Sequence, residues 1–342
     1  MAPPRIFAIG MYNRLYDIQL ASLMKGFGTV GIPAIERTFK RSKILKLVDI
    51  FWGLVWNVRR YDVVHCQAHS GLIMIAVALA AVWCRIIRKR IVVMYYGGGA
   101  KLFFQRWPRF YLFVFSLIHE VVVAGEFMRG VFEELGVKVT VIPHIIDVEK
   151  WPRRLRDKPG NQLLWVRHLQ DEYNPMMLLE VFKKLYAGNP DLRLCVVGRG
   201  KLEEKVAKFI ESESLVGVEL LGRVSDEKLK CLFAEADFFI NTSRIDNQPV
   251  SVLEAMSSGV PVVSTDPGGI PDIIESGVNG MLSQEGNSDA MVSNFKRIME
   301  NAELYASVSH AGMKSVEDRF GTRKILAHWD LVYRRMGFPF GS

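Results

Sequence analysis

The chain has few cysteines and lacks the short signatures of several enzyme classes. Its 342 residues include only four cysteines, which are scattered, with no C-x-x-C pair and no Cys/His ligand spacing. This usage fits a reducing compartment and excludes a disulfide framework and a zinc site. No G-x-S-x-G, G-x-x-x-x-G-K-[ST] or H-E-x-x-H motif occurs. Hydrolases, P-loop NTPases and metalloproteases that depend on those motifs are therefore excluded.

Apolar runs long enough to cross a membrane are also lacking. The run at 71–84, GLIMIAVALAAVWC, has 14 residues, whereas a spanning helix needs roughly 20. Its composition predicts a buried core helix, and the basic residues that follow (85–90) leave contact with a membrane surface as the alternative. The first residues, MAPPRIFAIG, have no apolar core or cleavage site, so we expect no signal peptide.

Basic charge is concentrated in the first part of the chain. Residues 1–150 carry 20 Lys and Arg against 10 Asp and Glu, whereas the remainder carries 24 against 26. A basic half favours an anionic substrate, an anionic membrane surface or nucleic acid. Lys40, Arg41, Lys43 and Lys46 lead into LVDIFWGLVWNV, which is typical of a basic interfacial helix. Nucleic acid is disfavoured because no RNP, helix-turn-helix or zinc-finger pattern accompanies the charge.

Apolar β-rich runs alternate with helical stretches along the whole chain. This order predicts an α/β protein with two doubly wound, Rossmann-like domains facing a central cleft. The polar, proline-broken segment 151–160 marks the boundary. We expect domains at 1–155 and 156–321, with a last helix at about Thr322–Met336 (within 322–342) packing back on the first. The predicted strands are Arg5–Gly10, Asp62–Gln67, Arg90–Tyr96, Glu120–Gly125, Lys138–His144, Leu163–Leu169, Leu192–Gly198, Val218–Gly222, Asp237–Thr242, Pro261–Thr265 and Gly280–Ser283.

The segment DNQPVSVLE at 246–254 predicts an anion site. A helix beginning at Pro249 and stopped by Gly259 would follow the strand at 238–240. Its first N–H groups favour a bound anion, and Glu254 is the one charge in an otherwise small and apolar helix. With Asp246 eight residues earlier, the segment predicts a site for a phosphorylated, polyhydroxylated ligand.

This region resembles the signature of GT-B fold, family 4-type retaining glycosyltransferases (glycosyl transferases group 1). Their acidic pair, E-x7-E, corresponds to Asp246 and Glu254, followed by LEAMSSGVPVVSTDPGGIP. The segment VIPHIIDVEKW at 141–151 is similar to the IPNxID segment of the family, and LGRVSDE at 221–227 is similar to its FLGRVS segment. The run KCLFAEADFFINTSR from Lys230 completes the order, so the resemblance covers roughly residues 120–335.

The resemblance implies a role for each part of the donor site. Glu254 would bind the ribose hydroxyls, and Asp246 would face the transferred sugar. The main chain near Val224 would meet the base, and Asn247 lies in the same loop as Asp246. The backbone of Pro249, Val250 and Ser251 would hold the diphosphate.

An arginine and a lysine usually neutralise that diphosphate in the family. Arg167 occupies the arginine position and is implied, with Asp246, as a catalytic residue. Tyr173 or Asn174 stands where the lysine is expected, so one phosphate cation is missing, and both residues are predicted to line the donor site. The alternative for Arg167 is a surface salt bridge, and for Asp246 and Asn247 ordinary turn chemistry before proline.

On the first domain, YYGGG at 95–99 stands where the family usually reads HGG. Tyr96 takes the histidine position, and Gly97 and Gly98 would let the backbone approach the sugar or acceptor, the alternative being a plain flexible turn. The remaining histidines, including His65 and His144, are predicted to be structural. The lone G-x-G at 198–200 indicates a βα turn as readily as a dinucleotide fingerprint, which disfavours a Rossmann oxidoreductase.

The chain contains no Asp-x-Asp. We therefore expect no metal and no cofactor, with cations and helix N–H groups holding the leaving charge. The resemblance implies a hexosyltransferase that moves a hexose from a UDP- or GDP-type sugar to a saccharide or lipid-linked acceptor with retention, in cell-surface polysaccharide or glycolipid synthesis. We expect a cytoplasmic protein that associates peripherally with the cytoplasmic face of a membrane. Two alternatives remain: a nucleotide-binding scaffold with little or no turnover, and a related epimerase or phosphorylase.

Overall fold

The chain divides into two compact units, each described here by itself. The structure is a computed structural model and describes residues 4–9, 14–32, 34–37, 43–69, 71, 73–97 and 100–339. The first unit comprises Met1–Ile145 with Phe320–Ser342, and the second comprises Ile146–Arg319. The sequence-based division after residue 155 differs from this one by residues 146–155.

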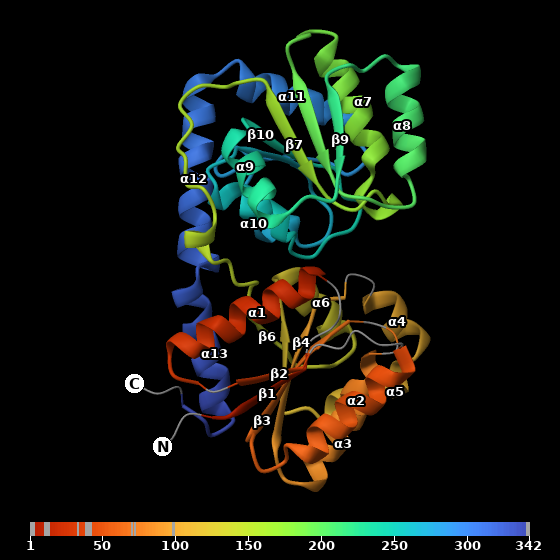
Figure 1. Cartoon of the computed structure of the whole chain (residues 1–342), viewed down its shortest axis with the longest axis vertical. Helices are drawn as coiled ribbons and strands as arrows, with labels where there is room; N and C mark the ends of the chain where they lie inside the picture. The colour runs from red at the N-terminus through yellow and green to blue at the C-terminus, as the bar shows by residue number, and fades with distance from the viewer. Residues whose placement is uncertain are drawn as a thin grey trace. The chain divides into compact units, whose positions relative to one another are not determined.

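The first unit is built on a parallel sheet (Figure 1). Within the described residues the sheet has six parallel strands in the order β2-β1-β3-β4-β5-β6, so the order in which strands are added reverses between β1 and β3. The strands are β1 (Ile6–Ile9), β2 (Ala34–Arg37), β3 (Val63–Ala68), β4 (Arg90–Tyr95), β5 (Glu120–Val123) and β6 (Thr140–Val141). The helices are α1 (Arg14–Thr29), α2 (Lys43–Trp56), α3 (Ile73–Ile86), α4 (Ala100–Arg106), α5 (Pro108–Ser116), α6 (Glu126–Glu134) and α13 (Thr322–Arg335).

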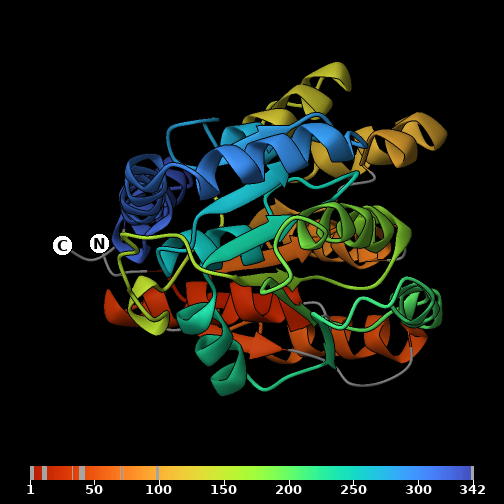
Figure 2. The same cartoon turned by 90° about the horizontal axis from the view of Figure 1, so that it is seen from above.

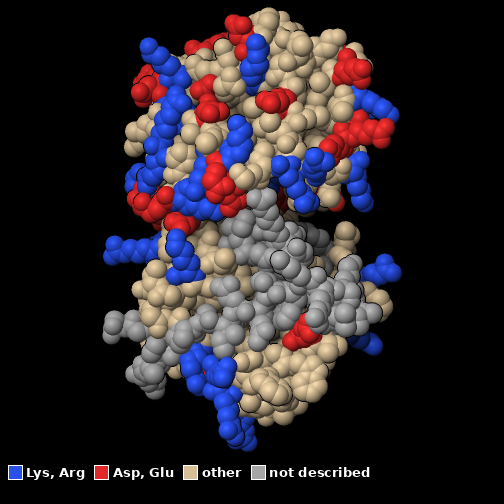
Figure 3. Space-filling view, viewed as in Figure 1, with Lys and Arg blue, Asp and Glu red and all other residues tan. Residues whose placement is uncertain are grey.

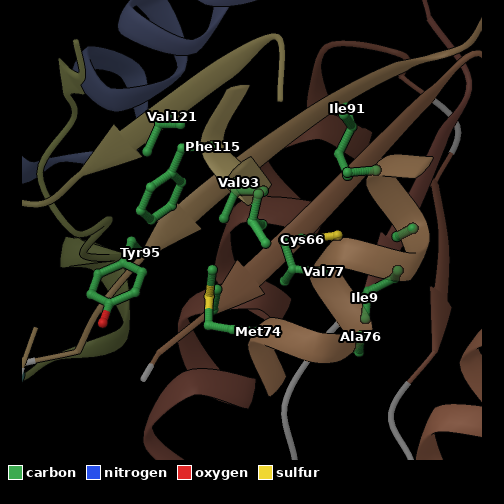
Figure 4. Packing of buried hydrophobic residues seen from close by; sticks show 14 of the residues in the cluster. Ile9, Cys66, Met74, Ala76, Val77, Ile91, Val93, Tyr95, Phe115 and Val121 are labelled. Atoms are coloured by element: carbon green, nitrogen blue, oxygen red, sulfur yellow. The ribbon is translucent and has the colours of Figure 1, made fainter. Parts of the chain in front are cut away.

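Alternate residues of the strands fill two cores, one on each face of the sheet. Phe7 and Ile9 of β1 join the core under α2 to α6, whereas Ile6 and Ala8 join the core under α1 and α13. Figure 4 shows Val77 and Met74 of α3 packed beside Cys66 of β3 in the first of these cores. The apolar helix predicted at 71–84 is therefore a core helix, as expected, and one stripe of its side chains packs in the core.

Helix α13 packs on the first sheet, as expected for the last helix. Tyr333 places its hydroxyl 3.1 Å from Nδ1 of His65, which is fully buried on β3. The rings of Trp329 and His65 lie 4.8 Å apart. Burial lowers the pKa of His65 to about 3, so the ring is neutral and structural, as predicted.

The second unit repeats the architecture with another strand order. Its six strands run parallel in the order β12-β11-β10-β7-β8-β9, the arrangement of a classical Rossmann sheet. They are β7 (Gln162–Val166), β8 (Arg193–Val197), β9 (Val218–Gly222), β10 (Phe238–Asn241), β11 (Val262–Thr265) and β12 (Met281–Ser283).

Helices cover both faces of this second sheet. Figures 1 and 2 show α7, α8 and α11 on one face and α9 and α10 on the other. The helices are α7 (Pro175–Tyr186), α8 (Glu203–Ser212), α9 (Asp226–Glu235), α10 (Val250–Ser257), α11 (Ser288–Met299) and α12 (Ala302–Phe320), with single turns η1 (Val148–Lys150), η2 (Asp171–Tyr173) and η3 (Ile270–Asp272). Side-chain caps begin three of them: Asn174 for α7, Ser225 for α9 and Asn287 for α11.

Each predicted strand has a counterpart in the structure, and one strand was missed. β2 is a four-residue edge strand with the sequence AIER, too short and too polar to form an apolar run. Conversely, the segment predicted as a polar boundary contains buried residues. Trp151 packs against Phe233, and Arg156 is only 2% exposed.

Arg156 anchors this segment to the second unit. Its guanidinium donates to the carbonyl oxygens of Ala236, Ser258 and Phe233 at 2.7–2.8 Å, and to two others. Burial lowers the pKa of Arg156 to about 10. The side chain thus ties the end of α9, the loop before β11 and the segment 151–160 together.

Candidate functional site

The strand order of the second sheet brings the loops after β7 and β10 together. These strands are neighbours, and β8 and β11 follow them on opposite sides. Ligands of open α/β sheets bind at the carboxyl ends of strands at such a reversal. Arg167 directly follows β7, and residues 242–249 follow β10.

Arg167 and Asp246 meet at this point. Nη2 of Arg167 lies 2.9 Å from Oδ2 of Asp246, and their side chains are 7% and 15% exposed. Burial raises the pKa of the Asp246 carboxyl, whereas Arg167 and the N–H of Asn247 lower it. Nη2 makes no well-aligned hydrogen bond within the described residues. The two side chains therefore form a close, mostly buried ion pair at the ends of these strands.

A hydrogen-bonded network of small polar side chains at the ends of β10 and β11 supports Arg167. Nε of Arg167 donates to Oδ1 of Asn241 at 3.3 Å, and Nδ2 of Asn241 donates to Oγ of Ser264 at 2.9 Å. The hydroxyl of Ser243 donates to the same Asn241 oxygen at 2.9 Å, and Thr265 donates to the Ser243 carbonyl at 2.7 Å. Sequence reasoning did not include these four residues. In the sequence they could have been found as polar residues directly at the ends of apolar strands, in NTS at 241–243 and ST at 264–265.

Tyr173 and Asn174 take structural positions beside Arg167. The guanidinium of Arg167 lies over the Tyr173 ring, 5.3 Å from its centre, so the tyrosine that replaces the expected lysine orients the arginine. Asn174 has φ +47° and caps α7, with its side-chain oxygen accepting from Met177 N at 3.3 Å. That oxygen is engaged by the helix, which leaves the predicted donor contact of Asn174 to its other atoms.

Helix α10 begins beside this loop. It starts at Val250 after Pro249 and has no side-chain cap, so its first N–H groups have no partner within the helix. The hydroxyl of Ser251 is buried and has no hydrogen-bond partner among the described residues. Glu254, one turn further, is 9% exposed and is the one charged residue of a helix whose eight residues are all buried. Gly259 has φ +71° just past its end, as expected.

Four glycines hold the site loops close together. A Cβ on Gly268 or Gly269 would collide with the carbonyl oxygens of Asp246 and Asn247, respectively. A Cβ on Gly198 or Gly200 would likewise collide with the backbone of residues 167–169. The G-x-G at 198–200 is therefore a packing turn that supports the Arg167 loop.

The other donor residues predicted from sequence lie in the same unit. Asn247 is 9% exposed and follows Asp246 directly. Val224 is half-buried in the loop between β9 and α9, directly before the capping residue Ser225. Their predicted contacts with the donor stay predictions.

The first unit holds the residues predicted on the sugar or acceptor side. Tyr96 is buried after β4, accepts from Gln67 Nε2 at 3.2 Å and lies 5.1 Å from the His144 ring. A Cβ on Gly97 would approach the Tyr95 hydroxyl to 2.8 Å, which gives this glycine a packing role. Gly98 lies outside the described residues, as do residues 10–13 after β1.

No metal-binding cluster of three or more His, Cys, Asp or Glu occurs in the described part of the chain. Two surface hollows of about 440 and 550 Å³ lie at 112–140 and 271–319. None of the predicted site residues lines either hollow. The candidate site therefore rests on the strand-end geometry.

The family-model comparison fits this geometry. The model of glycosyl transferases group 1 matches residues 147–315, which is almost the whole second unit. The second unit is therefore similar to the glycosyl transferases group 1 family over nearly its whole length. Among proteins similar to this chain is the amylovoran biosynthesis glycosyltransferase AmsK of Erwinia amylovora, 30% identical over 54% of this chain and 47% of that protein.

A further relative matches part of the chain, and solved structures share its fold. The putative colanic acid biosynthesis glycosyltransferase WcaL of Salmonella typhimurium is 28% identical over 53% of this chain and 47% of that protein. The chain spans about half the length of the curated relatives it matches. The Anabaena protein HepE, solved with UDP and glucose, has a TM-score of 0.78 at 17% identity and covers 98% of this chain and all of that one. The chain has the GT-B fold, as predicted.

Within the described ranges, none of the helices has both the length and the apolar character needed to cross a bilayer.

Proposed function

We propose that this chain transfers a hexose from a UDP- or GDP-type nucleotide sugar to a saccharide or lipid-linked saccharide, with retention of anomeric configuration. The proposed setting is the synthesis of cell-surface polysaccharide or glycolipid. One observation carries the proposal: at the reversal point of the second sheet, Arg167 after β7 meets Asp246 in the loop that leads into α10. The names of AmsK and WcaL, and the UDP and glucose bound to HepE, support the substrate classes.

In the proposed reaction the site must stabilise the charge of the leaving diphosphate. Breaking the sugar–phosphate bond leaves negative charge on the diphosphate, and fixed positive groups in a buried site stabilise that charge. Arg167 would supply a guanidinium that is already oriented by Tyr173 and Asn241. The N–H groups of Val250 and Ser251, with the Ser251 hydroxyl, would complete the phosphate site.

The remaining donor contacts are those that the resemblance to the family implies. Glu254 would accept from the ribose hydroxyls, one turn beyond the phosphate-binding N–H groups. The main chain near Val224 would meet the base. Asp246 would hold the hexose, and no metal would be required because Arg167 and the helix N-terminus neutralise the diphosphate.

Arg167 is engaged by Asp246 before any donor arrives. A diphosphate would compete with the Asp246 carboxylate for the same guanidinium, so removing that charge should favour the anion. Asp246→Asn should therefore tighten UDP binding roughly tenfold while transfer falls, the gain being comparable to one charged contact. If UDP binding weakens in a folded Asp246→Asn protein, the competition for Arg167 is wrong.

The deciding experiment is isothermal calorimetry with UDP, GDP and ADP, followed by donor hydrolysis and transfer assays. Glu254→Ala should weaken nucleotide binding by about 1–3 kcal/mol, the value of a lost charged hydrogen bond. Glu204→Ala, on the exposed side of α8 with an ion pair to Lys208, is the matched control. If no nucleotide binds the wild-type chain, the proposed enzyme is wrong.

A binding protein without turnover is the second candidate. Tyr96 stands where the family has a histidine, and its hydroxyl is engaged by Gln67 in a buried setting. That position would not supply an imidazole near the reacting carbon. Nucleotide binding without hydrolysis or transfer, over a broad panel of acceptors, would favour this candidate over the enzyme.

A lipid-linked acceptor would require the protein to work at a membrane. We propose a cytoplasmic protein that associates peripherally with the cytoplasmic face, as the basic first half of the sequence suggests. The residues suited to that contact form a surface of their own, distinct from the donor site.

A further inference from the structure

The outer faces of several helices in the first unit are apolar. α3 packs Met74, Ala76, Val77, Ala80, Ala81 and Cys84 inward, yet exposes Ile75, Leu79, Val82 and Ile86 at 39–69%. These four recur at intervals of four, three and four residues, which places them on one outward stripe. A surface helix of a soluble protein normally has polar residues there.

The apolar stripe continues onto the neighbouring helices. α3 contacts both α2 and α5, and α4 contacts α5. We call the exposed side chains of this layer the apolar face: Val48, Phe51, Trp52, Trp56, Ile75, Leu79, Val82, Ile86, Leu102, Phe103, Trp107, Phe110, Leu112 and Phe113. They are fourteen of the 21 large hydrophobic side chains exposed among the described residues. Such a concentration indicates an interaction surface.

Basic residues accompany this face. Residues 43–116 carry 11 Lys and Arg against two Asp and Glu, an excess of nine, whereas the whole chain has a net charge of +8. Asp62, one of the two acids, is paired with Arg5 and Lys89. Exposed arginines without an ion pair to another described residue are Arg59, Arg60, Arg85, Arg88, Arg106 and Arg109. In Figure 3 the visible surface over α2 and α3 is almost uncharged, and basic side chains border it.

We propose that the apolar face docks on the surface of a bilayer containing anionic lipid. Three tryptophans, Trp52, Trp56 and Trp107, are 58%, 83% and 58% exposed, and tryptophan favours the boundary between lipid and water. Arginines around them would meet lipid phosphates and the negative surface potential. α3, at 14 residues, is about 21 Å long, so it lies on the membrane and does not cross it.

Charge argues against a second copy of the chain as the occupant. Two such faces brought together would oppose two excesses of positive charge, which disfavours a symmetric dimer. A bilayer with anionic headgroups is complementary in both respects, since it offers an apolar layer beneath a negative surface. The inference goes beyond the donor chemistry because none of these residues belongs to the proposed nucleotide site.

Vesicle co-sedimentation tests the inference with the full chain. The probes are vesicles of phosphatidylcholine alone and of phosphatidylcholine with phosphatidylglycerol. We expect binding to the anionic vesicles, weaker binding to the neutral ones, and a loss of binding as salt is raised. Trp56→Ser with Trp107→Ser should lower the partition coefficient roughly tenfold, because two interfacial anchors are removed. Arg85→Gln with Arg106→Gln should lower it roughly fivefold for each arginine.

Matched variants in the second unit act as controls. Val216→Ser with Val278→Ser removes exposed apolar side chains, and Lys201→Gln with Lys205→Gln removes exposed charge. Both controls should partition like the wild type, and circular dichroism with thermal melting establishes folding. Absence of binding to anionic vesicles, or equal loss in the controls, overturns the inference. A dimer in sedimentation velocity that the tryptophan variant dissociates overturns it in favour of a second copy. Calorimetry with UDP in the absence of vesicles reports separately on the proposed function.

Discussion

The two units share one architecture and differ in where their polar residues lie. Each is a parallel sheet of six strands between helices. In the second unit the polar side chains gather at the strand ends, around Arg167, Asn241 and Asp246. In the first, the exposed sides of α2 to α5 are apolar. The same scaffold thus supports an anion site in one unit and a surface for a hydrophobic partner in the other.

One helix from each unit shows the contrast. α3 of the first unit reads IMIAVALAAVWCRI and is apolar all round. α8 of the second reads EEKVAKFIES, and only Val206 is buried. Both helices cover a sheet, so the core requires a single apolar stripe in each case. The second, exposed apolar stripe of α3 does not pack in the core, so it does not contribute to the stability of the unit.

The largest expected effect is the loss of transfer when Arg167 is removed. Arg167→Ala should lower the transfer rate about 10³-fold, because the leaving diphosphate loses a preorganised charge. Arg167→Lys should recover only part of this rate, since an ammonium cannot use the planar contact with Tyr173. Arg129→Ala in the first unit, an exposed partner of Glu126, should leave the rate unchanged. The measurement is the initial rate of transfer to a saccharide acceptor; a rate for Arg167→Ala within tenfold of the wild type would remove Arg167 from the reaction.

Much of the second unit could be predicted from sequence because its determinants are local. Buried parallel strands give uninterrupted apolar runs, and Pro249 and Gly259 fix both ends of α10. The Arg167–Asp246 pair is different, because 79 residues separate its members and the contact depends on β7 lying next to β10. The network through Asn241 and Ser264 depends on the same order.

In the first unit the sequence left two questions that only packing resolves. The sequence of an all-apolar helix such as α3 does not show which of its stripes faces the sheet, so a core helix was predicted with membrane-surface contact as the alternative. In the structure one stripe is buried in the core and another is exposed. The position of Tyr96 followed from a motif, whereas its contacts with Gln67 and His144 come from β3 and from the chain after β6.

The next effect concerns stability and separates the units. Arg156→Ala should destabilise the second unit by at least about 3 kcal/mol, because several buried carbonyl oxygens lose a charged donor. Hydrogen exchange should then show faster exchange in β10 and β11 while β1 and β3 keep their protection. Arg153→Ala, an exposed partner of Glu317, should change stability by less than about 0.5 kcal/mol. Equal loss of protection in both sheets would mean that the units unfold together.

A pH effect belongs to the first unit. His65 is neutral when folded because burial lowers its pKa from 6.5 to about 3. In the unfolded chain the ring gains a proton below about pH 6.5, so the unfolded state binds more protons between pH 6.5 and 3, and stability falls as the pH falls. At pH 5 this contribution is about 2 kcal/mol. Urea unfolding at pH 7 and pH 5 should show it in full in the wild type and in His310→Gln, which changes an exposed histidine. In His65→Phe only the smaller part from His119 and His328, whose pKa values burial also lowers, should remain. The same pH dependence in His65→Phe would assign it to other groups.

The smallest effect tests the helix N-terminus of the second unit. The Ser251 hydroxyl is buried without a hydrogen-bond partner among the described residues, which costs folding free energy that a ligand contact would recover. Ser251→Ala should therefore leave the chain as stable as the wild type or slightly more stable, and should weaken UDP binding by about 1 kcal/mol. Ser257, at the other end of α10, also has a buried hydroxyl with no hydrogen-bond partner among the described residues. Ser257→Ala should therefore affect stability similarly and leave UDP binding unchanged. Calorimetry and thermal melting of the two variants distinguish a phosphate contact at Ser251 from a general property of serines in this helix. If both variants lose affinity equally, the diphosphate does not lie at the start of α10.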